Sequence, residues 1–283
     1  MTSSTPMVLV LGATGKTGSR LTRKLTQRGV AVRTAARHGA DVRFDWSDAT
    51  SFGPAVRSID RIYLMTPVLG IADVPDRVGR FLDTAAAAGT QHVTDLSAYG
   101  MDQAALEVTM RSGELDLLSR NDFTHSILRP AWFMQNFTEG HLVPADGCIT
   151  VPTGEGAEAF VDVEDIAAVA AVTLADPAAH AGAEYAPTGP EAMTVAGAAH
   201  LISTITGQSI RHRDIDSRAW IEASVAAGIP ADYSDMLALL TETVASGHGS
   251  LPNNDVEKAT GIPATSFADF VGRTAHQFVG SRK

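Results

Sequence analysis

The chain has 283 residues, of which 45% are hydrophobic and 19% charged, a balance that excludes an intrinsically disordered protein. Its net charge of -10 argues against a nucleic-acid partner, because contacts to phosphates need a basic surface. The single cysteine, Cys148, excludes an internal disulfide. The sequence shows neither the basic start of a signal peptide nor an apolar run of the ~20 residues that cross a bilayer. We therefore expect a cytoplasmic protein that does not bind membranes.

Strands and helices alternate through the first 130 residues. The wholly apolar run at 7–11 predicts a strand buried on both faces, as in a parallel sheet. The elements predicted after it are a helix at 19–28, strands at 30–37 and 42–44, a helical turn at 50–57, a strand at 62–65, a helix at 72–88, a strand at 92–96, a helix at 103–119 and a strand at 124–128. This alternation predicts an α/β protein with a doubly wound parallel sheet of the Rossmann type.

The pattern changes after Pro130. Residues 131–160 are rich in loops, and the rest is mainly helical, with helices predicted at 162–174, 194–206, 216–227, 234–246 and 265–279 and extended pieces at 184–187 and 209–212. We therefore expect a Rossmann domain over 1–130, with the helix at 162–175 packing back on it, and a smaller, mostly helical C-terminal substrate lobe over 131–283.

Three glycines, Gly12, Gly15 and Gly18, separate the first strand from the first helix with the spacing GxxGxxG. Between a strand and a helix, such a turn lets a dinucleotide pyrophosphate reach the backbone N–H groups at the helix N-terminus. The predicted donors between the glycines are Thr14, Lys16 and Thr17. A purely structural turn is the alternative, and the Walker spacing of an ATP-binding loop is absent.

The end of the second strand indicates which nucleotide is bound. An NAD-selective site usually carries Asp or Glu there, whereas this strand ends in Arg37, whose guanidinium suits a 2′-phosphate. NADPH is therefore favoured over NAD, although Arg37 could also be a solvated surface charge. Asp45 and Trp46 follow the third strand and would lie near the adenine, with helix capping as an alternative role for Asp45.

The next two strands end at the same edge of the sheet, where ligands of open α/β sheets bind. The residues predicted to flank the ribose and nicotinamide there are Thr66, Pro67 and Ser97.

Residues for proton transfer are harder to find. Short-chain dehydrogenases ordinarily use a tyrosine and a lysine four residues later, but Tyr99 is followed four residues on by Gln103. Hydride transfer itself belongs to the cofactor, so an electrophilic substrate needs no strong acid. His141, in the loop after the sixth strand, is a candidate proton donor, and Tyr99 is a weaker one. The scattered histidines give no metal-binding spacing, so no metal is expected.

Aromatic residues make up only 6% of the chain, so the cluster after the sixth strand stands out. Trp132 and Phe133, with Asn136 beside them, would shape the site of a flat apolar substrate. The alternative is that these rings pack the two lobes together.

Several segments resemble a known family. VLVLGATGKTG at 8–18, SILRPAWFMQNF at 126–137 and FVDVEDIA at 160–167 resemble the NmrA-like, atypical short-chain dehydrogenases. Phe44-Asp45-Trp46 and the stretch at 132–137 look most like the branch of ergot-alkaloid festuclavine and agroclavine dehydrogenases and their bacterial relatives.

The resemblance implies an NAD(P)-binding lobe, a small C-terminal substrate lobe and a cleft between them. Family members include NADPH-dependent quinone, imine and triphenylmethane reductases, and redox-sensing regulators that bind the nucleotide without turnover. Many reductases of the family carry Lys or His in the helix after the fifth strand. Here that stretch runs from Glu107 to Glu114, and its nearest basic residue is Arg111, which becomes a further catalytic candidate.

Our first hypothesis is an NAD(P)H-dependent reductase that transfers hydride to a small planar electrophile such as a quinone, imine or iminium. The alternatives are an NAD(P)-sensing regulator without turnover, and a redox-neutral isomerase or cyclase. The expected partner is a small molecule, and the expected assembly is a monomer or homodimer.

Overall fold

The computed structural model describes residues 6–67, 73–106, 108–249 and 251–279. The chain start, position 72 of the predicted helix and Glu107 lie outside the described residues. The chain forms two compact units: the first comprises Met1–Pro130, Val163–Pro187 and Asp255–Ile262, and the second comprises Ala131–Asp162, Thr188–Asn254 and Pro263–Lys283.

The first unit contains a parallel sheet. Among the described residues its strands are β1 (Met7–Leu11), β2 (Ala31–Ala36), β3 (Val42–Arg43), β4 (Arg61–Met65), β5 (His92–Leu96), β6 (Thr124–Leu128) and β9 (Glu184–Tyr185). Their order is β3-β2-β1-β4-β5-β6-β9, and every pairing is parallel. The chain reverses its direction of winding between β1 and β4, which is the switch point of a Rossmann fold. The predicted fold class is therefore confirmed.

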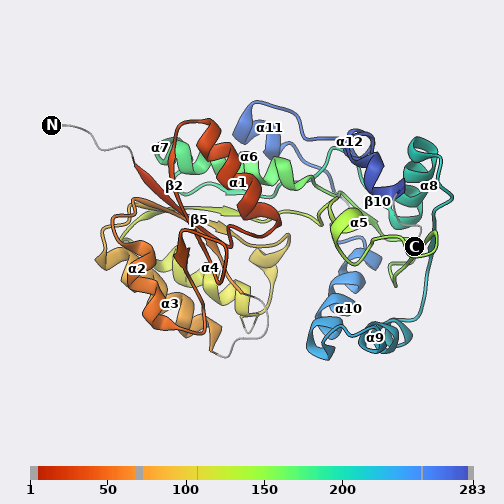
Figure 1. Ribbon diagram of the computed structural model, residues 1–283, viewed down its shortest axis with the longest axis horizontal. Coiled ribbons are helices and arrows are strands. Elements are labelled where there is room, and N and C mark those ends of the chain that lie inside the picture. The colour runs from red at the N-terminus through yellow and green to blue at the C-terminus, as the bar shows by residue number, and fades with distance from the viewer. Residues whose placement is uncertain (1–5, 68–72, 107, 250, 280–283) are drawn as a thin grey trace. The chain divides into compact units, whose positions relative to one another are not determined.

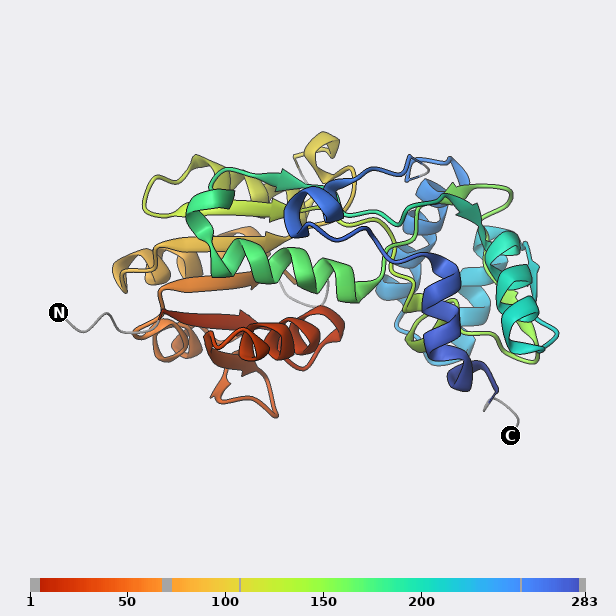
Figure 2. The ribbon, with the colours of Figure 1, turned by 90° about the horizontal axis from the view of Figure 1, so that it is seen from above.

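Helices cover both faces of this sheet (Figures 1 and 2). One face carries α1 (Lys16–Gln27) and α6 (Val163–Ala175), and the other carries α2 (Phe52–Val56), α3 (Val74–Ala87) and α4 (Thr109–Ser119). Alternate strand residues such as Leu9, Leu64 and Val93 are buried with Phe81 and Leu117 of the second helix layer. Because β1 and β4 are covered on both sides, they read as nearly continuous apolar runs, whereas β5 buries His92, Thr94 and Asp95 among its five residues.

Some predicted bounds differ from the structure. The helix expected at 103–119 is divided into a 3-10 turn, η2 (Met101–Gln103), and α4, which begins only at Thr109. The helical turn expected at 50–57 is a 3-10 turn, η1 (Ala49–Ser51), followed by α2. The elements α7 (Pro177–His180) and α11 (Asp255–Thr260) were not predicted, because four to six residues give too little periodicity to detect.

The second unit is mainly helical. Its elements are α5 (Asn136–Glu139), β7 (Cys148–Thr150), β8 (Ala157–Glu158), β10 (Met193–Thr194), α8 (Val195–Thr206), β11 (Arg211–Arg213), α9 (Ser217–Ala226), α10 (Ala231–Ala245) and α12 (Phe267–Val279). Two short ladders, β10 with β8 and β11 with β7, join its loops. Its core is aromatic: Phe137 packs edge-on against both Phe160 and Phe267, with ring centroids 5.1 Å apart in each pair.

Over the described ranges, no helix is both long and apolar enough to span a bilayer. No group of three or more histidine, cysteine or acidic side chains is arranged to hold a metal ion within that part of the chain.

Candidate functional site

The glycine turn lies between β1 and α1, at the carboxyl edge of the sheet. Gly12 has a φ of +63°, a conformation that favours glycine, and its carbonyl oxygen accepts from the Gly15 N–H at 2.9 Å. A Cβ on Gly18 would lie 2.3 Å from the Gly12 oxygen, so only glycine allows α1 to pack this closely on the turn. The close packing brings the N-terminus of α1 to the end of β1.

This N-terminus is open to an anion. Gly15 is the N-cap of α1, no side chain from the described residues caps the helix, and its first turn contains no acidic residue. The N–H groups and the partial positive charge of the helix end are therefore available to phosphate oxygens. Thr14 is exposed and Lys16 half-buried, whereas Thr17 is buried. Added Cβ atoms on Gly12 and Gly18 would collide with Met65 and with the backbone of the turn, so these glycines keep the turn compact, and its contact with a pyrophosphate stays a prediction.

Arg37 is exposed just after β2 and has no ion pair among the described residues. The turn that carries it approaches the glycine turn, since a Cβ on Gly39 would lie 3.8 Å from the Thr14 methyl carbon. Arg37 therefore lies two residues before Gly39, the residue of this turn that approaches the glycine turn at Thr14. This arrangement supports a role at a ribose phosphate, which stays a prediction.

Asp45 and Trp46 are held more tightly than the sequence indicates. The Asp45 carboxylate accepts from the Ser47 N–H at 2.9 Å and from Arg43 at 3.2 Å, while Asp48 caps η1 instead. The Trp46 ring is 6% exposed and packs edge-on against Phe44 at 5.0 Å. The ring of Trp46 is thus part of the core. Contact of Asp45 and Trp46 with an adenine stays a prediction.

The carboxyl ends of β4 and β5 carry the other predicted cofactor residues. Thr66 is buried and lies against α4, where a Cβ on Gly113 would be 3.4 Å from its hydroxyl, and Pro67 follows it. Ser97 is also buried, and among the described residues its hydroxyl has no hydrogen-bond partner. Tyr99 is half-buried, and its N–H donates to the Pro130 oxygen at 3.0 Å. Thr66 and Ser97 therefore end neighbouring strands of the same sheet edge.

A buried ion cluster that the sequence did not reveal lies under this edge. Glu114 of α4 is completely buried and accepts from Arg129 Nε at 2.9 Å and Arg129 Nη2 at 3.0 Å. Arg111, the weak catalytic candidate, donates at 2.9 Å to Glu114 Oε2, the oxygen that also accepts from Arg129 Nη2. Arg129 also donates to Glu184 at 2.5 Å. Arg111 is thus engaged with Glu114, although its Nε is buried without a partner in the described part of the chain.

Asp95 lies next to this cluster, in the middle of the sheet. Its side chain is 2% exposed, and burial followed by the nearby negative charge of Glu114 raises its pKa to about 8, against the opposing effect of Arg129. The only available sequence signal for it was a carboxylate inside a predicted central strand.

The predicted substrate residues belong to the second unit. Trp132 and Phe133 are half-buried, and the backbone of Phe133 forms an isolated parallel β-bridge with Val161. The Trp132 ring meets His141 edge-on, with centroids 4.9 Å apart, and Asn136 begins α5. The structure brings Trp132 and His141 together, and their roles toward a substrate stay predictions.

Glu158 of β8 also went unnoticed in the sequence. Its carboxylate is 2% exposed and accepts from the Trp132 N–H at 3.1 Å, and burial raises its pKa to about 7. The Trp132 segment is thus fixed by a carboxyl group that titrates near neutrality.

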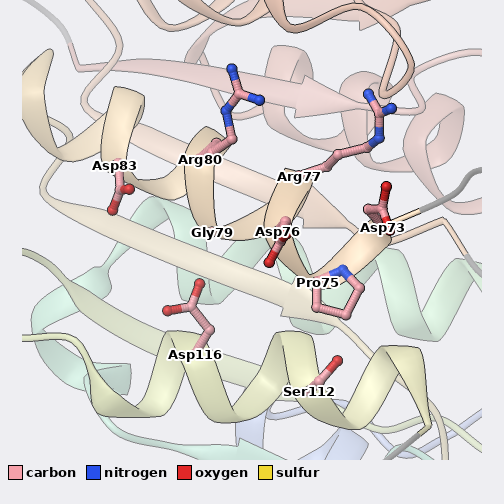
Figure 3. Close-up of a pocket in the computed structure, with 9 residues that line it drawn as sticks. All are labelled: Asp73, Pro75, Asp76, Arg77, Gly79, Arg80, Asp83, Ser112 and Asp116. Carbon is pink, nitrogen blue, oxygen red and sulfur yellow. The ribbon is translucent and has the colours of Figure 1, made fainter.

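A solvent-facing hollow of about 520 Å³ lies between α3 and α4 (Figure 3). It is polar, with Asp76, Asp83 and Asp116 on its walls and Arg77 and Arg80 along α3. None of the residues predicted to bind nucleotide or substrate lines it, so it is not the site described above.

No family model matches the chain. It is 34% identical over 277 residues to the oxidoreductase YesF of Bacillus subtilis (strain 168), covering 95% of each chain. It is 30% identical over 287 residues to festuclavine synthase II of Penicillium roqueforti (strain FM164), covering 95% of this chain and 98% of the relative.

Solved structures share the fold. The NADPH-dependent quinone oxidoreductase of Escherichia coli, solved with NADPH, matches with a TM-score of 0.78 at 20% identity over 95% of this chain and 99% of that one. The negative transcriptional regulator NmrA, solved with NAD, matches with a TM-score of 0.69 at 15% identity over 99% and 93%. The first chain is a quinone oxidoreductase and the second a regulator, so the shared fold alone does not assign an activity.

Proposed function

Because this chain belongs to the NmrA-like family of atypical short-chain dehydrogenases, in the branch of the festuclavine and agroclavine dehydrogenases and their bacterial relatives, we propose that it is an NADPH-dependent reductase of small planar electrophiles. The observation that carries this proposal is the uncapped N-terminus of α1 behind the glycine turn, at the switch point of the sheet.

The residues have separate tasks in this proposal. Gly12, Gly15 and Gly18 hold the pyrophosphate, and Arg37 binds the 2′-phosphate. Thr66, Pro67 and Ser97 lie beside the ribose and nicotinamide. The cofactor supplies the hydride when it is bound, so the protein binds, orients and exchanges a proton. In the second unit, Trp132, Phe133 and Asn136 contact the flat substrate, which we propose is a quinone, imine or iminium.

The activity can be tested by mixing the protein and NADPH with a panel of quinones and cyclic imines, and following the absorbance of the reduced nicotinamide. We expect oxidation of NADPH that depends on both protein and acceptor. The control is Gly53→Ala, which should oxidise NADPH as the unsubstituted protein does, because the added methyl in α2 meets open space. A panel in which NADPH binds but is never oxidised would contradict the reductase.

A nucleotide-sensing protein is the second candidate. The observation in its favour is the start of α4, which contains Thr109, Met110 and Arg111 but no lysine or histidine, and whose Arg111 is paired with Glu114. A sensor would bind NADP(H) with similar affinity in the presence or absence of electron acceptors, and would leave the nucleotide unchanged.

A further inference from the structure

The starting point is a carboxyl group whose burial the fold does not compensate. Asp95 is 2% exposed in β5, and its Oδ1 has no hydrogen-bond partner among the described residues. Buried polar groups in proteins are nearly always hydrogen-bonded, and an isolated buried carboxylate is especially unfavourable. Asp95 therefore weakens the fold, which points to another use for it.

The charges around Asp95 are already balanced without it. Arg111 and Arg129 are two cations, and Glu114 and Glu184 are the two anions that they bind. An ionised Asp95 would add an unmatched negative charge beside the fully buried Glu114. Asp95 is consequently the member of the group that carries a proton at neutral pH, in agreement with its pKa of about 8.

The register of the sheet places Asp95 and Ser97 on the same face, with Ser97 at the carboxyl edge where the proposed site lies. Ser97 follows two residues after Asp95, and its N–H donates to the Leu128 oxygen at 2.8 Å, so the parallel ladder continues to that point. Residues two apart in a strand share a face and are separated by roughly 6.6 Å along it. The Ser97 hydroxyl is buried without a partner in the described chain, and one water molecule between the two side chains closes such a gap.

We infer that Asp95 stores the proton that this site delivers through Ser97 to the reduced substrate. The inference rests on the proposed reductase. Reduction of a quinone carbonyl requires a hydride, which brings two electrons from NADPH, and a proton on oxygen. The Ser97 hydroxyl gives its proton to that oxygen, the Asp95 carboxyl replaces it, and solvent reprotonates Asp95 after the product leaves.

If the nicotinamide binds at the end of β5 as proposed, its positive charge after hydride transfer would stabilise the Asp95 carboxylate and so favour this proton transfer. The charged and titratable groups around Asp95 come from several elements. Glu114 and Arg111 approach from α4, and Arg129 approaches from the end of β6 with Glu184 of β9 bound to it. Tyr63 of β4 is paired with Thr94 and lies on the opposite face of the sheet, toward Thr17 of α1. Burial raises the pKa of Tyr63, so it remains neutral.

The first test measures protons released on nucleotide binding, with a pH indicator in weak buffer near pH 7.5. We expect the protein to release more protons with NADP⁺ than with NADPH, because only the oxidised ring is cationic. Asp95→Asn should abolish the difference, while the Kd values of both nucleotides change by less than about threefold, under 1 kcal/mol. The matched control is Asp102→Asn, since Asp102 is exposed in η2 and should leave the difference intact.

The second test is the pH profile of turnover with a quinone. We expect kcat to decrease as pH rises through about 8 and Asp95 loses its proton, and Asp95→Asn to lower kcat at least about tenfold and remove this decrease. Ser97→Ala should lower kcat but retain the extra proton release with NADP⁺. This variant separates the relay from a folding defect.

The outcomes distinguish the two proposals. If neither nucleotide binds, the cofactor assignment fails and the inference fails with it. If both bind, and Asp95→Asn leaves the proton difference or the pH profile unchanged, only the inference is wrong. If the proton difference depends on Asp95 but no acceptor is reduced, the reductase is wrong and Asp95 is not a proton donor to substrate.

Discussion

Arg37 determines the expected choice between the two nicotinamide cofactors. Its guanidinium is exposed at the end of β2 and can form charge-assisted hydrogen bonds with a 2′-phosphate that NADH lacks. We expect Arg37→Ala to weaken NADPH binding about 10- to 100-fold and NADH binding less than about twofold, as measured by calorimetry.

The matched control for Arg37 is Arg57→Ala. Arg57 is exposed at the C-terminal end of α2, so its removal changes the net charge equally without touching the end of β2. Equal losses for NADPH and NADH in Arg37→Ala would contradict the assignment. A similar loss in Arg57→Ala would instead indicate a general electrostatic effect of the net charge.

Single residues differed in how far the sequence could place them. Gly12 and Gly18 were found by spacing, because a backbone turn and a close helix contact leave little choice of residue. The burial of Trp46 was not predictable, since an aromatic ring after a strand looks the same in the sequence whether it faces a ligand or packs against Phe44 and Phe81. Asp95 was missed because its pKa depends on Glu114, a neighbour in space nineteen residues away.

The packing of α1 on β1 provides a test at the scale of elements. An alanine methyl at position 18 would meet the Gly12 carbonyl oxygen at 2.3 Å and Ala13 Cα at 2.9 Å, which are backbone atoms that cannot rotate away. We expect Gly18→Ala to lower the free energy of unfolding by about 2 kcal/mol and to weaken NADPH binding, because α1 must move from the turn.

The comparison for Gly18 is again Gly53→Ala, measured in the same urea titrations. Gly53 lies in α2 with no atom near its added methyl, so this change should be neutral or stabilising by up to about 1 kcal/mol. If the two variants unfold at the same urea concentration, the close contact between α1 and the turn is not important for stability.

Elements with a strong pattern were predicted well, and those shaped by contacts were not. The strands β1, β4, β5 and β6 lie within one residue of their predicted bounds. Burial on both faces makes β1 wholly apolar, and β4 is apolar after Arg61. The start of α4 was misplaced by six residues. Local propensity permits helix from 103 onward, but the turn η2 precedes it and α4 forms where Gly113 lies against Thr66.

Two buried groups of the first unit should affect the stability of the whole molecule with opposite signs. The pKa of His92 is lowered to about 4 by burial and nearby positive groups, so folded His92 stays neutral where the unfolded chain takes up a proton. Its contribution to stability is lost as pH falls from about 6.5 to 4. The raised pKa of Asp95 acts in the other direction, and stability is lost as pH rises from about 4 to 8.

Urea unfolding of variants at several pH values separates these contributions. Relative to the unsubstituted protein, Asp95→Asn should gain stability from pH 5 to 8, at most about 1.4 kcal/mol per pH unit. His92→Asn should gain relative stability as pH falls from 6.5 to 4.5. A variant whose stability follows that of the unsubstituted protein at every pH would show that its group does not titrate between those limits.

The net charge of -10 sets a condition on the proposed cofactor, because NADPH is itself an anion. In the proposed function its binding depends on local groups, namely the N-terminus of α1 and Arg37. Both roles are sequence-based predictions that the Arg37→Ala and Gly18→Ala variants test. The sequence could not predict how the ion cluster at Glu114 is arranged, because residues from α4, β6 and β9 come together there only in the folded sheet.

The discontinuous course of the chain has a consequence for biosynthesis. The first unit takes α6 and β9 from residues beyond 160, and α11 from Asp255–Ile262. A nascent chain of 130 residues can form the sheet from β1 through β6, but one apolar face of that sheet stays exposed. The residues of α6 that cover this face, among them Val169, Ala170 and Leu174, have not yet been synthesised. The nucleotide-binding unit therefore completes its folding only near the end of translation, and the half-built sheet is the stage at which a chaperone would engage the chain.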